Sequence, residues 1–139
     1  MLTRRALGPE RPLPPEWLSV QTVPRPAKGF KDEFGYNAIR IPLYLIRGEV
    51  AEPELIRSMI SAMAPDGTAV NLTDLTNGQV TERLTDPGYR ILPALAACVL
   101  DGTAIPAELR RFQPTLYYPS TLHLLSLAYV AERHPECLS

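Results

Sequence analysis

Two stretches of this 139-residue chain are apolar at almost every position, and they restrict its possible folds more than any other feature. In residues 36–47 the main exception is Arg40, and in residues 89–100 it is Arg90. A helix that is apolar all round is stable only when neighbours cover every side of it. We therefore predict two helices that are buried on all sides.

Two further segments have helical patterns. In residues 53–64 the apolar side chains form one stripe, and the polar ones lie opposite, which predicts an outer helix with one solvated face. The stripe consists of Leu55, Ile56, Met59, Ile60 and Met63, and the opposite face of Glu54, Arg57, Ser58 and Ser61. Residues 120–132 are again apolar around most of the circumference and predict another buried helix.

Residues 68–84 alternate β-branched and polar side chains around the dipeptide Asn77-Gly78. This dipeptide accepts the positive φ angles of a tight turn, so we predict a β-hairpin. The fold class is therefore mainly α with a small β-hairpin. Six prolines within residues 9–26 favour extended or turn geometry, and we expect this segment to lie across another surface.

Composition excludes several classes of function. A chain of this length with 45% hydrophobic residues can form one domain or part of a larger one. Its net charge of -1, without a basic stripe, argues against a nucleic-acid partner. No window approaches the roughly 20 apolar residues of a membrane span, and the first residues lack the apolar core of a secretory signal. Without a phosphate-binding loop or paired metal ligands, we expect no cofactor and no metal.

Three residue types allow more than one interpretation. Cys98 and Cys137 could pair in an oxidising compartment, but the apolar surroundings of Cys98 favour a buried free thiol. His123 lies on an apolar helix and is predicted to be a hydrogen-bonded core residue rather than a catalyst. Trp17 could be a platform for a sugar, although we favour an indole packed into the core.

Tyrosines open three similar segments, residues 35–42, 88–93 and 117–122, and a proline follows each of them closely. Proline near the first turn of a helix removes few hydrogen bonds, because the first N–H groups have no partner in the helix. If the buried helices run parallel, their starts share one end of the molecule. Four tyrosines would then gather there, either as core residues or as the lining of a groove: Tyr36, Tyr89, Tyr117 and Tyr118.

Residues 34–45, FGYNAIRIPLYL, resemble a motif of glycoside hydrolase family 8, which reads aromatic or Ser, then Tyr-Asp-Ala-Ile-Arg-Val. Residues 13–20, 86–100 and 117–132 resemble further segments of this family in the same order. The likeness covers residues 13–134 and is strongest to bacterial endoglucanases, or cellulases, that accompany cellulose synthase.

The resemblance implies part of an (α/α)6 toroid, the six-hairpin glycosidase fold, in which parallel inner helices alternate with outer helices that run back. It implies three parts: a proline-rich segment 1–12, the C-terminal part of a catalytic domain 13–134, and a tail 135–139. Members hydrolyse β-1,4-glucans with inversion, using a carboxylic acid and a carboxylate base about 6.5–9.5 Å apart. Family members are typically periplasmic or secreted, whereas the compartment of this chain stays unknown.

The sequence departs from the family at both catalytic groups. The family's acid is a glutamate of the N-terminal half, which has no counterpart here, so we expect the chain alone to be inactive. It would need that missing half or a self-associating copy as a partner. The family's base is replaced by Asn37, whose amide cannot accept a proton from water. Asn37 could orient the water while Asp32, Glu33 or Asp86 accepts the proton, or it could be a helix N-cap.

Arg40 matches a family arginine of the substrate cleft, and we predict that it holds the sugar and the catalytic water. The alternative is a salt bridge that locks two helices, because an unpaired buried guanidinium is costly. The predicted binding residues for β-glucan polysaccharide are Tyr36, Arg40, Tyr117 and Tyr118. The alternative function is a non-catalytic helical remnant or glucan-binding module.

Overall fold

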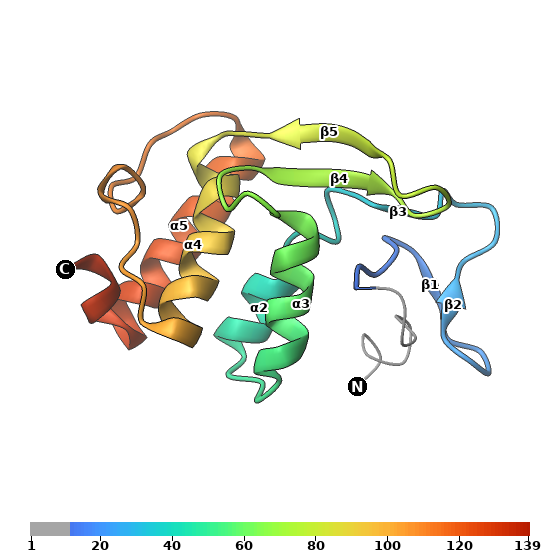
Figure 1. Cartoon of the computed structure of the whole chain (residues 1–139), viewed down its shortest axis with the longest axis horizontal. Coiled ribbons are helices and arrows are strands. Elements are labelled where there is room, and N and C mark those ends of the chain that lie inside the picture. The colour runs from blue at the N-terminus through green and yellow to red at the C-terminus, as the bar shows by residue number, and fades with distance from the viewer. Residues whose placement is uncertain (1–11) are drawn as a thin grey trace.

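The computed structural model describes residues 12–139, so the predicted segment 1–12 lies almost entirely outside the described residues. The helices pack side by side beneath a small sheet, and a two-stranded arm stands out to one side (Figure 1). The helices are α2 (Ile41–Arg47), α3 (Pro53–Met63), α4 (Pro87–Asp101) and α5 (Tyr117–Arg133), with short 3-10 helices η1 (Ala107–Leu109) and η2 (Pro135–Leu138).

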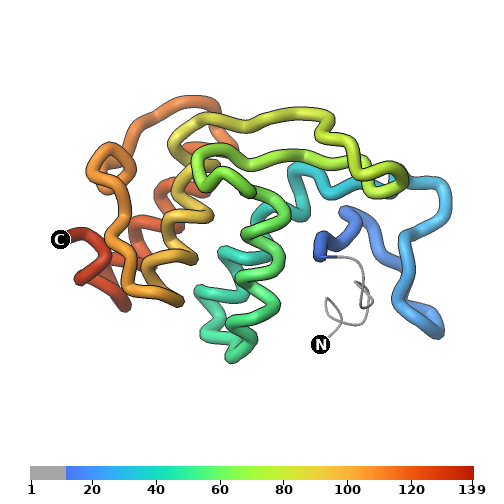
Figure 2. Tube along the Cα trace, in the orientation of Figure 1, coloured from blue at the N-terminus to red at the C-terminus, as the bar shows by residue number. Residues whose placement is uncertain are grey.

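Helices α2, α4 and α5 run in the same direction, and α3 runs back between the end of α2 and the sheet (Figures 1 and 2). The starts of the three parallel helices therefore share the end of the molecule that the sheet covers. Helix α4 lies in the middle, because it packs against α2, α3 and α5. No residue of α4 before Asp101 is exposed, which confirms the predicted all-round burial of this helix.

The solvated face of α3 is also confirmed. Leu55, Ile56, Met59 and Met63 are buried, whereas Glu54, Ser58 and Ser61 on the opposite side are exposed. The structure is therefore rich in helix, with α4 as a buried helix and α3 as an amphipathic helix, as the sequence patterns indicate.

Two helix predictions need correction. The helix expected over 36–47 begins only at Ile41, after turns through residues 36–40. Pro42 explains this, because its ring would clash with the carbonyl of Ala38 if the helix continued upstream. Helix α5 begins at Tyr117, three residues earlier than predicted. Pro119 is tolerated in its first turn, because the N–H that proline lacks would have no helical partner there.

The predicted all-round burial is wrong for α2 and α5. Tyr44 and Arg47 of α2 are exposed, and so are Leu124 and Ala128 of α5. Helix α2 packs against α4 and α3, and α5 packs against α4 and η2. The part of the chain that the structure describes leaves uncovered only the sides of α2 and α5 that carry these exposed residues.

The predicted hairpin is confirmed as β4 (Val70–Asp74) and β5 (Val80–Leu84), which are antiparallel. Gly78 adopts a φ of 75° in the connecting turn, as the Asn-Gly dipeptide allows. A third strand, β3 (Glu33–Phe34), extends the sheet in the order β3-β4-β5. Strands β1 (Leu18–Ser19) and β2 (Arg25–Pro26) form the separate arm.

The two cysteines form a disulfide, so the prediction of a free thiol at Cys98 is wrong. The chain returns after α5 through η2 and brings Cys137, which is fully buried, to a Cα distance of 5.9 Å from Cys98. The two cysteines are 39 positions apart in the sequence, so no local pattern indicated that they pair. The core role of His123 is confirmed: the ring is fully buried, and Nε2 lies 2.8 Å from the Leu109 carbonyl oxygen.

Among residues 12–139, no helix is both long enough and apolar enough to cross a membrane.

Candidate functional site

Three tyrosines meet where the parallel helices begin. The ring of Tyr118 lies 6.2 Å, between centroids, from the rings of both Tyr36 and Tyr89, and its hydroxyl donates a hydrogen bond to the carbonyl oxygen of Tyr36. Tyr89 is buried, Tyr118 is half-buried, and Tyr36 is 40% exposed. The cluster thus runs from the core to the surface, whereas Tyr117 is 87% exposed and points outwards.

Close approach of α4 and α5 makes this cluster possible. A Cβ added to Gly88 would lie 1.7 Å from the carbonyl oxygen of Pro119. Only a glycine therefore fits at this crossing, which adjoins Tyr89 on one helix and Tyr118 on the other.

The phenols of the cluster stay protonated well into the alkaline range. Burial raises the pKa of Tyr89 and the pKa of Tyr118, each to about 12. The pKa of Tyr36 is also raised, mainly because its hydroxyl is hydrogen-bonded to the carboxylate of Glu82, with burial as a smaller cause. At neutral pH these groups are therefore hydroxyl donors beside an exposed aromatic surface.

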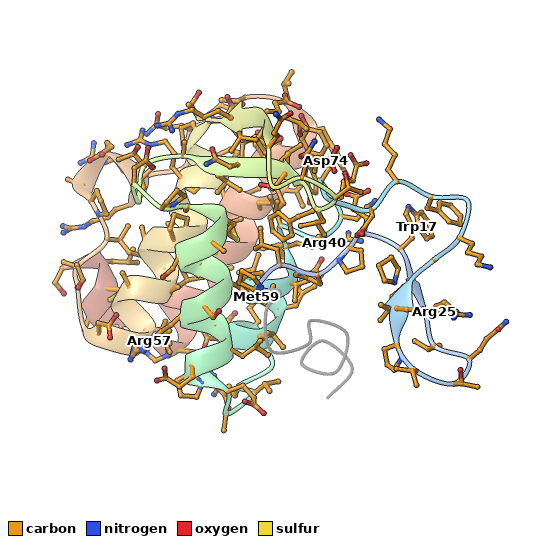
Figure 3. The ribbon with its side chains drawn as sticks, turned by 45° about the vertical axis from the view of Figure 1, so that its right-hand side comes forward. Trp17, Arg25, Arg40, Arg57, Met59 and Asp74 are labelled. Atoms are coloured by element: carbon orange, nitrogen blue, oxygen red, sulfur yellow. A yellow bond between two sulfur atoms is a disulfide. The ribbon has the colours of Figure 1, made fainter. Side chains whose placement is uncertain are left out.

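Arg40 is the N-cap residue of α2, and its guanidinium carbon lies 5.8 Å from the centroid of the exposed Tyr44 ring. Its charge also acts on the phenol of Tyr118, so Arg40 lies near the tyrosine cluster. Within residues 12–139, no carboxylate forms an ion pair with Arg40. Figure 3 shows Arg40 between the helical body and the arm.

Asn37 lies in the turn before α2 and is not its N-cap, so the capping alternative is wrong. Its backbone N–H donates to Glu16 Oε1 at 2.6 Å, and its side-chain Nδ2 lies 3.4 Å from Glu16 Oε2. A Cβ on Gly35 would lie 2.4 Å from the same Oε1 atom, so this glycine lets the carboxylate approach. The turn thus holds an amide and a carboxylate in direct contact.

The hydrogen bonds between Asn37 and Glu16 were not predicted from the sequence. A signal existed, because Glu16 lies in residues 13–20, one of the segments on which the family resemblance rests. The carboxylates predicted as candidate bases, Asp32, Glu33 and Asp86, have other contacts. The backbone of Glu33 is in β3, where its carbonyl accepts from the N–H of Glu16 at 2.9 Å, and the charge of Asp86 contributes to the raised pKa of Tyr89. The Asp32 carbonyl accepts from the N–H of Leu75 at 2.9 Å.

The predicted core position of Trp17 is wrong. Half of its surface is exposed, and it stacks on Phe30, with 4.7 Å between ring centroids. The described residues contain no group of three His, Cys, Asp or Glu side chains that could hold a metal ion.

Comparison with known proteins shows what this chain is similar to. The structure is similar to a crystal structure of an endoglucanase from Komagataeibacter sucrofermentans, with a TM-score of 0.64 and 30% sequence identity, over 96% of this chain and 41% of that chain. The predicted resemblance to bacterial endoglucanases is confirmed. A curated protein from Novacetimonas hansenii, described as a probable endoglucanase, is 32% identical over 129 residues.

That match covers 86% of this chain and 34% of the relative, so the chain spans about a third of the length of the curated relative. No protein-family profile matches the chain. The similarity therefore extends over nearly all of this chain but over less than half of each endoglucanase.

Proposed function

We propose that this chain is the C-terminal part of an inverting endo-β-1,4-glucanase of glycoside hydrolase family 8 and forms one wall of its glucan-binding cleft. The observation that carries the proposal is the similarity of 96% of the chain to an endoglucanase of solved structure. The parallel helices, whose starts bear tyrosines and an arginine, support a toroidal six-hairpin arrangement in the intact fold.

Arg40 and the exposed tyrosines would bind the sugar. A guanidinium offers several donors in a plane, which suits neighbouring hydroxyl groups of a pyranose. The exposed faces of Tyr36 and Tyr44 offer flat surfaces for the C–H groups of a sugar ring. Tyr117, at the start of α5, would contact a more distant part of the glucan.

Hydrolysis with inversion needs a carboxylic acid on one side of the glycosidic bond and a carboxylate base on the other. Asn37 would orient the attacking water, and Glu16, whose carboxylate contacts Asn37, would accept its proton. The acid would belong to the remaining part of the fold. We therefore expect no turnover by this chain alone.

One observation favours a second candidate, a glucan-binding module without catalysis. The family's base position holds Asn37, which cannot act as a base. Both candidates require glucan binding, and they differ in turnover once the remaining part of the fold is supplied.

Electrophoresis in native gels containing neutral hydroxyethyl cellulose tests the binding that both candidates share. We expect the polymer to slow the wild-type chain and to slow Arg40→Ala much less. Arg133→Ala is the matched control, because Arg133 is an exposed arginine at the far end of α5 that pairs with Glu49. Equal retardation of the two variants, or none of the wild type, would contradict the proposal.

A further inference from the structure

We propose that the stacked rings of Trp17 and Phe30 form a second sugar-binding platform, on which a β-linked glucan stacks beyond the Arg40 and tyrosine cluster. The ligand class rests on the proposed function, since it is the same neutral β-glucan. The platform itself rests on the geometry of the arm.

The geometry is that of an exposed aromatic stack. The ring centroids of Trp17 and Phe30 are 4.7 Å apart and the planes are inclined by 23°, while the two residues are 50% and 53% exposed. By comparison, Phe34 is fully buried and belongs to the core. A large aromatic side chain gains most of its stabilisation from burial, so this solvated pair contributes little to the core.

The stack fixes the orientation of both rings before any ligand arrives. Phe30 covers one face of the indole, and half of the Trp17 surface remains exposed to solvent. The faces of an aromatic ring carry partial negative charge, and the C–H groups on the face of a β-linked pyranose carry partial positive charge. Ordered rings lose little conformational entropy on binding, which favours affinity.

The arm is joined to the candidate cleft by its backbone and by Glu16. Trp17 directly follows Glu16, whose carboxylate contacts Asn37, and the N–H of Ala27 donates to the Trp17 carbonyl at 3.0 Å. Figure 3 shows Arg40 on the side of the body from which the arm with Trp17 extends. A glucan bound at the cluster can therefore continue towards the platform.

Basic side chains on the arm could attract an anionic polymer instead. Arg25, Lys28 and Lys31 are all exposed. Binding driven by these charges would weaken as salt increases, whereas stacking of a neutral sugar would change little. Ionic strength therefore separates the two sources of affinity.

Trp17 is the only tryptophan of the chain, so its fluorescence reports on the platform directly. We expect titration of the full chain with cellohexaose to change the emission in a saturable way at low and at high salt, and α-linked maltohexaose to have a much smaller effect. Phe30→Ala keeps the reporter but removes its stacking partner, and we expect about fivefold weaker binding. Phe112→Ala, which truncates another exposed phenylalanine on a distant loop, should leave the affinity unchanged.

Arg40→Ala separates this inference from the proposed function. If the cleft does not bind glucan but the platform does, the emission still responds and the response is the same in Arg40→Ala. If the cleft binds and the platform does not, hydroxyethyl cellulose slows the wild-type chain while saturating cellohexaose leaves the emission unchanged. That second result overturns the platform, as does unchanged affinity in a Phe30→Ala protein whose circular dichroism is that of the wild type.

Discussion

Gly88→Ala should destabilise the protein strongly, although alanine is the better helix former. The new methyl group would lie 1.7 Å from the Pro119 carbonyl oxygen, and contacts of this kind are essentially never shorter than 3.0 Å. The starts of α4 and α5 must therefore separate by at least about 1.3 Å, which disturbs the tightly packed region beside Tyr89 and Tyr118. Overpacking of this kind costs about 3 kcal/mol, and helix propensity returns at most about 1 kcal/mol. The expected net loss is about 2 kcal/mol.

Urea unfolding followed by far-UV circular dichroism measures this loss. Gly35→Ala is the matched control, because its new methyl group would meet only the flexible carboxylate of Glu16, at 2.4 Å, and not backbone. We expect Gly35→Ala to lose less than half as much stability as Gly88→Ala. A Gly88→Ala protein within about 0.5 kcal/mol of the wild type would refute the close helix crossing on which the cluster depends.

Three further predictions concern the disulfide, the tyrosines and the base position. Reducing Cys98–Cys137, which closes a separation of 39 residues, should lower the free energy of unfolding by about 4 kcal/mol in urea titrations, and an unchanged midpoint would contradict the pairing. Alkaline titration of phenolate absorbance should show Tyr89 and Tyr118 ionising at pH about 12. Because these folded-state pKa values exceed the value of about 10 in an unfolded chain, their contribution to stability is complete below pH 10 and is lost as the pH rises towards 12. A Tyr118→Phe protein should lose part of this late phase, and full ionisation near pH 10 in a folded protein would refute the burial. In an enzyme completed with the remaining part of an endoglucanase, Asn37→Asp should raise hydrolysis of carboxymethyl cellulose, and lower activity would support a base elsewhere, such as Glu16.

Local patterns made much of the fold predictable. The stripe of α3 and the Asn77-Gly78 turn are set by neighbours within a few residues, and both appear as expected. The start of α2 was not predicted correctly, because the apolar run begins at Tyr36 whereas Pro42 prevents a helix upstream of Ile41. The prediction that parallel helices bring tyrosines together at their starts is confirmed for Tyr36, Tyr89 and Tyr118, whose rings are in contact.

Contacts distant in sequence were the ones that sequence reasoning missed. Glu16 and Asn37 are 21 positions apart, and Cys98 and Cys137 are 39 apart, so no local periodicity links them. The exposure of Trp17 was missed for a related reason. Trp17 directly precedes β1, and the local sequence does not indicate that this strand leaves the body of the molecule.

The burial of the three parallel helices supports the proposed cleft by a separate route. Helix α4 is covered because α2 and α5 lie on either side of it, whereas each outer member of the row exposes large apolar side chains, such as Tyr44 and Leu124. An isolated amphipathic helix would carry polar residues on such a side, as α3 does. In the proposed toroid, further helices beside α2 and α5 would cover these exposed apolar side chains. In a curved row of this kind, the helix starts, with Arg40 and the tyrosines, would surround one cleft.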